Sequence, residues 1–216
     1  MEAMRVVSVN VGHAEEISHG KRAMVTGINK KAADGRVRVG ELGLASDAIC
    51  DTRHHGGADQ AVYAYSAEDY AWWSQQLGRD LRYGTFGDNL TISGMPDDMN
   101  AGDRLLIGDV VLEATSPRIP CSTLAAQMQD SNFGLAFRRA GKPGFYFRVL
   151  NEGDVGRGDS VTYVDNPGAN VSMLELFRAS YEIRPPAATL RRFIDAPIAA
   201  RMRDNFEKKL AATAGD

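Results

Sequence analysis

The feature that most constrains this chain is a proline-rich turn that ends in a cysteine, Thr115-Ser-Pro-Arg-Ile-Pro-Cys-Ser122. Each proline fixes its own φ at about −65° and pushes the preceding residue toward an extended conformation. Residues 109–114, before the turn, predict a strand, and residues 123–129, after it, predict a short helix with Ser122 as its N-cap. The segment therefore predicts a strand, a stiff turn, a cysteine and a helix in that order.

The position of Cys121 indicates a chemical role. A cysteine at a helix N-terminus is ionised more easily because of the helix dipole, and the charge of Arg118 acts in the same direction. Since an unperturbed thiol has a pKa of about 8.5, ionising most of it at neutral pH needs a shift of about two units. The alternative is an inert cysteine in a strand-to-helix turn, because free cysteines are commonly buried.

The composition is that of a soluble globular protein. The chain has 216 residues, of which 44% are hydrophobic and 25% charged, enough for one large core and a small additional unit. A net charge of −3 without any basic run argues against general nucleic-acid binding. The N-terminal region has no long apolar segment, and no stretch of about 18 apolar residues occurs, so we expect a cytoplasmic protein with no membrane contact.

The order of short valine-rich stretches and glycine-containing turns predicts a mainly β region over residues 1–165. We expect strands at 5–11, 23–28, 36–39, 61–65, 104–107, 110–114, 145–150 and 160–164. Gly108-Asp109 predicts a tight hairpin between two of them. Helices are expected at 67–77, with Ser66 as N-cap, and at 132–140.

The composition changes after Asp165-Asn-Pro-Gly-Ala-Asn170. The following residues predict three helices, at 171–181, 187–195 and 197–210, and hence a small C-terminal domain over residues 166–216. So small a unit needs to bury its apolar face against the β region or against a second copy of the chain. A homodimer is therefore one alternative.

Five motifs, taken together and in this order, resemble the MOSC domain family. The likeness is strongest to its YiiM-type members, which carry a C-terminal three-helix domain. One departure is Asp88, where the family often has glutamate, and another is the absence of a glycine beside Asp47. The motifs are Val25-Thr-Gly-Ile-Asn-Lys30, His55-Gly-Gly-Ala-Asp-Gln-Ala-Val-Tyr63, Gly84-Thr-Phe-Gly-Asp-Asn-Leu90, Pro117-Arg-Ile-Pro-Cys121 and Gly144-Phe-Tyr-Phe-Arg-Val-Leu150.

The resemblance implies a mostly antiparallel β-barrel with peripheral helices that binds molybdenum cofactor, a pyranopterin dithiolene. It implies that Cys121 is the thiolate ligand of molybdenum, and that the activity is reduction of N-hydroxylated compounds, such as hydroxylaminopurine base analogues, to amines. The dithiolene supplies two sulfurs, so a single cysteine is enough for the protein's share. Because the chain has no flavin, haem or iron–sulfur signature, an external reductase would have to supply the electrons.

Two other functions remain open for the same cysteine. One is a non-catalytic carrier that binds molybdenum cofactor or sulfane sulfur on Cys121 and passes it on. The other is thiolate hydrolysis or transfer without a metal, for which the sequence offers no evident Cys-His-Asn or Cys-His-Asp arrangement.

Further site residues follow from the motifs. Lys30, Arg118 and Arg148 are candidates for the anionic cofactor, because guanidinium and ammonium groups bind oxyanions. His55 is a candidate catalytic residue at the pocket rim, with Gly56 and Gly57 allowing the backbone to approach the cofactor. Asn89 is a further candidate ligand in a glycine-flanked turn.

Cys50 with His54 and His55 raises the alternative of a zinc site. Adjacent side chains of an extended segment diverge, and no fourth ligand is evident, so the sequence disfavours zinc there.

Overall fold

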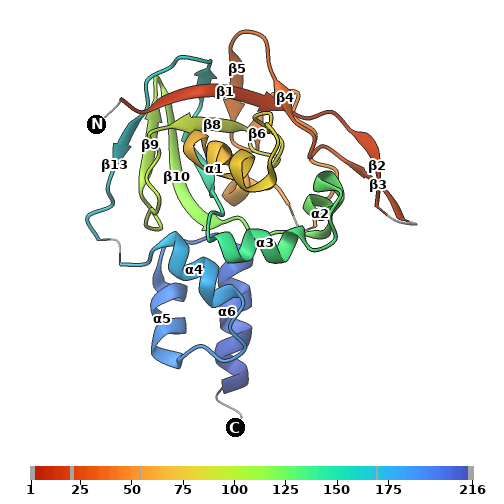
Figure 1. The fold of residues 1–216 in the computed structure, drawn as a ribbon. Helices are drawn as coiled ribbons and strands as arrows, with labels where there is room; N and C mark the ends of the chain where they lie inside the picture. The colour runs from red at the N-terminus through yellow and green to blue at the C-terminus, as the bar shows by residue number, and fades with distance from the viewer. Residues whose placement is uncertain (1–2, 20–21, 54, 169, 214–216) are drawn as a thin grey trace.

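The computed structural model describes residues 3–19, 22–53, 55–168 and 170–213 (Figure 1). Within these residues one large sheet has the strand order β13-β9-β10-β11-β7-β8-β1-β4. All of its described ladders are antiparallel except β7–β8. Its strands are β1 (Arg5–Val11), β4 (Lys31–Ala32), β7 (Val62–Ser66), β8 (Leu90–Ser93), β9 (Arg104–Ile107), β10 (Val110–Pro117), β11 (Phe145–Asn151) and β13 (Thr162–Val164).

The N-terminal part of β1, which β4 does not cover, meets the chain just before β13 without a continuous ladder. Arg5 in β1 and Ser160, just before β13, form one isolated antiparallel bridge, and the Val6 amide donates to the Asp159 carbonyl at 2.9 Å. The described strands thus make a strongly curved sheet in which β1 and the chain before β13 touch, and the closed barrel expected from the family stays a prediction.

Local sequence signals explain several of the elements. Gly108, at φ 58°, turns the chain between β9 and β10, which pair as the predicted hairpin. Helix α1 (Ala67–Leu77) begins at Ser66, whose side chain accepts hydrogen bonds from the Glu68 and Asp69 amides, as predicted. This helix connects the parallel strands β7 and β8.

Several short strands lie outside the ranges predicted from the sequence. β2 (Glu15–His19) pairs with β3 (Arg22–Thr26) in a two-stranded ribbon that extends from the large sheet toward α2 (Figure 1). A further small sheet has the order β12-β5-β6, with β5 (Val37–Gly40), β6 (Gly43–Leu44) and β12 (Gly153–Val155). A 3₁₀ turn, η1 (Ala58–Gln60), precedes β7.

An aromatic core lies beneath the helices α2 (Ser122–Met128) and α3 (Phe133–Ala140). Trp73 of α1 stacks on Phe137 of α3 at 6.0 Å between ring centroids, and its indole N–H donates to the Tyr65 hydroxyl. This packing fixes α1 and α3 together, next to the turn that carries Cys121.

The C-terminal helices α4 (Met173–Ser180), α5 (Ala187–Asp195) and α6 (Ala200–Thr213) lie at one end of the molecule (Figure 1). Their buried residues Leu176, Phe193 and Phe206 belong to the same apolar cluster as the strand residues Leu105 and Phe147. The core therefore runs from the sheet into the helices, and the division into domains at residue 165 stays a prediction. None of the described helices has the length and apolar character needed to cross a membrane.

Candidate functional site

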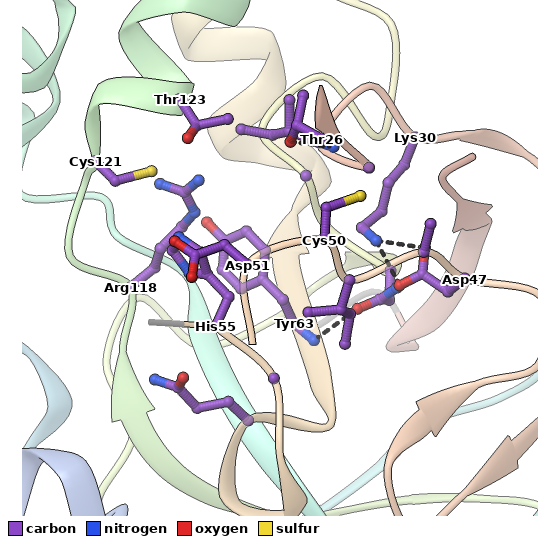
Figure 2. A pocket seen from close by; sticks show the side chains of 18 of the residues that line it. Thr26, Lys30, Asp47, Cys50, Asp51, His55, Tyr63, Arg118, Cys121 and Thr123 are labelled. Carbon is purple, nitrogen blue, oxygen red and sulfur yellow. Dashed lines mark hydrogen bonds and ion pairs between the residues drawn. The ribbon is translucent and has the colours of Figure 1, made fainter. Parts of the chain in front are cut away.

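A cavity of about 290 Å³ lies between the end of β3, the loop before η1, β7 and the start of α2. Figure 2 shows Cys121, Arg118 and His55 on one side of it and Lys30 and Asp47 on the other. The cavity brings together six of the predicted site residues, which are Lys30, His55, Gly56, Asn89, Arg118 and Cys121.

Cys121 lies at the start of α2 because the proline-fixed turn delivers it in an extended conformation, at φ −120° and ψ 172°. The residue is itself the N-cap, so the prediction that Ser122 caps this helix is wrong. The Cys121 carbonyl accepts the Leu124 and Ala125 amides, and no side chain makes a cap hydrogen bond. The predicted placement of the sulfur at a helix N-terminus is confirmed.

The surroundings of Cys121 favour its thiolate. Burial by itself raises the pKa of the thiol. A hydrogen bond from His55, the charge of Arg118 and a hydrogen bond from the Leu124 amide outweigh burial, and together they lower the pKa to about 6. His55 is therefore the partner that sequence spacing could not identify. At neutral pH the sulfur is mostly ionised, which suits a metal ligand or a nucleophile.

Arg118 lines the cavity with a guanidinium group that lacks some of its hydrogen-bond partners. Its side chain is buried, with the guanidinium carbon 5.5 Å from the Tyr63 ring centroid and 6.0 Å from that of Phe137. Its Nε and Nη1 atoms have no hydrogen-bond partner among the described residues. Buried donors of this kind are normally bonded, so the geometry fits an anionic group that occupies the cavity.

Lys30 is compensated within the protein. Its buried ammonium group forms an ion pair with Asp47, and both carboxylate oxygens accept from it. Asp47 also accepts the Gly12 amide at 2.7 Å and the Asn89 side-chain amide at 2.9 Å. The Lys30–Asp47 pair carries no net charge, so Arg118 is the stronger of the two anion-binding groups.

Asp47 is a cavity residue that the sequence analysis did not select. The sequence signal for Asp47 was the absence of the expected glycine beside it. Ser46 takes that place with a φ of 65°, a left-handed conformation that favours glycine. The turn at Ser46 aims the Asp47 carboxylate at Lys30 and at the Asn89 turn.

Asn89 and Asp88 hold the neighbouring strands. The Asn89 side chain accepts the Tyr63 amide at 3.1 Å, in addition to its bond to Asp47. Asp88 is fully buried, accepts the Tyr70 hydroxyl at 2.5 Å and the Thr91 hydroxyl at 2.6 Å, and has a pKa raised by burial. Asn89 therefore lines the cavity and connects β7 to Asp47, whereas Asp88 lies in the core, away from the cavity.

The structure does not place Arg148 and Gly57 in the cavity. Arg148 forms ion pairs with Asp59 at 2.8 Å and with Glu113 at 3.3 Å, and it donates to the Pro197 and Ile198 carbonyls. Gly57, at φ 85°, precedes η1 as its N-cap and lines a separate surface groove. Their roles as cofactor ligands stay predictions that these positions do not favour.

Gly56 does line the cavity, and its φ of 70° favours glycine. An added Cβ would lie 2.9 Å from the Ile49 side chain. The alternative zinc site depends on His54, which lies outside the described residues. In the described part of the chain, no group of three or more His, Cys, Asp or Glu side chains is arranged to hold a metal ion.

The fold and the thiolate cavity define a class, and comparison with known proteins identifies it. A model of the MOSC domain matches residues 51–162, and the chain belongs to this family. An uncharacterized protein of Bacillus subtilis, YflK, is 30% identical over 210 residues, which cover 96% of this chain and 95% of YflK.

Two further relatives carry informative names. The crystal structure of YiiM from Geobacillus stearothermophilus superposes with a TM-score of 0.79 at 32% identity, covering 96% of this chain and 99% of that one. A Gibberella moniliformis protein named "Reductase" is 29% identical over 160 residues, covering 72% of this chain but only 28% of its own length. The likeness to YiiM thus spans nearly the whole chain.

Proposed function

We propose that this protein is a molybdenum-cofactor-dependent reductase of N-hydroxylated compounds, with Cys121 as the thiolate ligand of the metal. The observation that carries the proposal is one cavity that holds both a thiolate and a buried arginine with unpartnered donors, in a chain of the MOSC family. The name of the Gibberella relative supports a reductase, although this chain spans only 28% of it.

The residues present fit the cofactor. A dithiolene leaves room for one soft protein ligand, and the Cys121 thiolate is such a ligand. The free Nε–H and Nη1–H donors of Arg118 suit a phosphate or another anionic part of the group. When bound, the cofactor would supply a metal centre able to accept oxygen from an N–O bond in a two-electron reduction.

The remaining steps belong to the chain itself. His55 holds the Cys121 sulfur in its ionised form through their hydrogen bond. His55 also lines the cavity, where its imidazole can pass a proton to the oxygen that leaves nitrogen. The Lys30–Asp47 pair keeps its own charges neutralised and orients the Asn89 amide at the opposite wall.

The electrons come from an external reductase in this proposal, and the protein acts in the cytoplasm. The C-terminal helices form a small domain on the closed β-barrel or pair with a second copy of the chain.

The test is the molybdenum content of protein expressed in a cofactor-competent host, measured by elemental mass spectrometry together with hydroxylaminopurine reduction by an artificial electron donor. We expect stoichiometric metal and turnover in the wild type and in Cys50→Ser, which removes the second cysteine of the same cavity. Cys121→Ser should lose both. Full metal retention in Cys121→Ser would contradict the proposal.

The same experiment separates the alternative functions. Cys121-dependent metal without turnover would favour the carrier of molybdenum cofactor or sulfane sulfur. Failure of the wild type to retain metal under competent conditions would leave Cys121 as a metal-free thiolate or a structural residue.

A further inference from the structure

The loop that carries His55 lacks regular secondary structure of its own. This His55 loop, residues 51–53 and 55–57, runs along the cavity just before η1. Its one described internal backbone bond joins the His55 amide to the Asp51 carbonyl at 3.0 Å. The position of His55 next to Cys121 must therefore depend on contacts from elsewhere in the fold.

Arg201, in the first turn of α6, supplies such contacts. Its Nη2 donates to the Thr52 carbonyl at 2.9 Å, and its Nη1 donates to the Gly56 carbonyl at 3.1 Å. Nη1 also donates to the Gln60 side-chain oxygen at 3.0 Å, which ties the loop to η1. One guanidinium thus bridges both ends of the His55 loop, and its planar fork fixes their separation.

The start of α6 is itself anchored to the same region. The Asp59 carboxylate of η1 accepts the Ala200 amide at 2.8 Å, so it caps α6 from outside the helix. Its other oxygen pairs with Arg148 at 2.8 Å, and the Ala199 amide donates to the Thr115 carbonyl of β10 at 2.9 Å. These bonds hold Arg201 at a defined place relative to the sheet.

We propose that Arg201 is a positioning residue that holds the His55 loop against Cys121, so that the C-terminal helix α6 supports the cavity from outside it. Arg201 does not line the cavity that holds the thiolate. It acts through the backbone carbonyls of the loop, and the part of the prediction that concerns turnover rests on the proposed function.

Hydrogen–deuterium exchange of the full-length, cofactor-free protein tests the positioning directly. Arg201→Ala should speed exchange of the amides at 51–60 by about ten-fold while the strands keep their wild-type rates. Arg201→Lys should restore part of the protection, because an ammonium group can reach one carbonyl but not bridge two.

Arg203→Ala is the matched control, since Arg203 lies on the same helix and bonds only the Ile194 and Ala196 carbonyls among the contacts described. It should leave the loop at its wild-type exchange rate. Unchanged loop exchange in Arg201→Ala, or equal loosening in Arg203→Ala, would overturn the proposal.

Turnover provides the second measurement. In protein loaded with molybdenum, Arg201→Ala should lower kcat about ten-fold with full metal retention, because the ligand Cys121 remains while His55 is displaced. Full kcat in a variant with a loosened loop would overturn the catalytic part. If the wild type itself shows no reduction, the proposed function fails, and the exchange experiment still decides the positioning role.

Discussion

His55 and Cys121 line the same cavity, and a hydrogen bond from His55 lowers the pKa of the Cys121 thiol, although His55 lies in the loop before η1 and Cys121 lies at the start of α2. This bond is the leading cause that opposes the effect of burial on the sulfur. The ionisation of Cys121 therefore depends on the position of a distant loop as well as on its own helix.

Removal of His55 should raise the pKa of Cys121. In a Cys50→Ser background, so that one thiol remains, His55→Ala should move this pKa from about 6 toward its ordinary value. The expected rise is about one to two units, because the charge of Arg118 and the Leu124 amide still act. The pH dependence of alkylation by iodoacetamide measures it. His13→Ala, at an exposed histidine, is the control, and an unchanged pKa in His55→Ala would contradict the assignment.

The lowered thiol pKa also predicts how stability changes with pH. The folded-state pKa of Cys121 is about 6 and the ordinary value is 9.0, so the unfolded chain binds more protons between these two pH values. The stabilisation by the thiolate is complete above pH 9 and is lost as pH falls through 6. Urea unfolding of cofactor-free Cys50→Ser and Cys50→Ser/Cys121→Ser proteins measures this effect. The difference between their free energies of unfolding should shrink as pH falls through this range, by at most about 4 kcal/mol. A difference that is constant with pH would exclude the shift.

The buried Arg118 and the partly exposed Arg148 should respond in opposite ways to loss of charge. In cofactor-free Cys121→Ser protein no thiolate compensates the charge of Arg118. In this background Arg118→Met should leave the free energy of unfolding unchanged or raise this free energy by about 1–3 kcal/mol. Arg148→Met breaks two ion pairs and should lower it by about 1–3 kcal/mol. Chemical denaturation measures both. Strong destabilisation by Arg118→Met would show that its donors are satisfied in the folded protein.

Glycine at position 46 should stabilise the protein. Ser46 has a φ of 65°, where a side chain is strained and glycine is not. We expect Ser46→Gly to raise the free energy of unfolding by about 0.5–1 kcal/mol, although the greater freedom of the unfolded chain offsets part of the gain. Thermal and urea unfolding measure the effect. Ser46→Ala, which keeps the Cβ, is the control and should show no gain.

The sequence predicted those elements whose signals are local. The Ser66 cap, the Gly108 hairpin and the strand–turn–cysteine–helix order are confirmed, because each depends on residues within one or two turns of chain. β2 was missed because Glu15–His19 is polar, so it lacks the apolar alternation that marks a strand with one buried face.

The wider arrangement of the site depended on tertiary contacts. Arg148 and Tyr146 share a face of β11, but a strand rises about 3.3 Å per residue, so Arg148 lies further along and meets Asp59 instead of the cavity. Asp47 meets Lys30 only because the Ser46 turn redirects the chain.

By itself, the sequence determined which chemical groups the protein has and the local shape of the turn that presents Cys121. Proline stereochemistry and helix formation act over a few residues, so they can be read from the chain. Only the tertiary structure decided that His55 meets Cys121, that Asp47 neutralises Lys30 and that Arg201 holds the His55 loop. Such pairings join segments far apart in the chain, and the packing of the whole fold sets their distances.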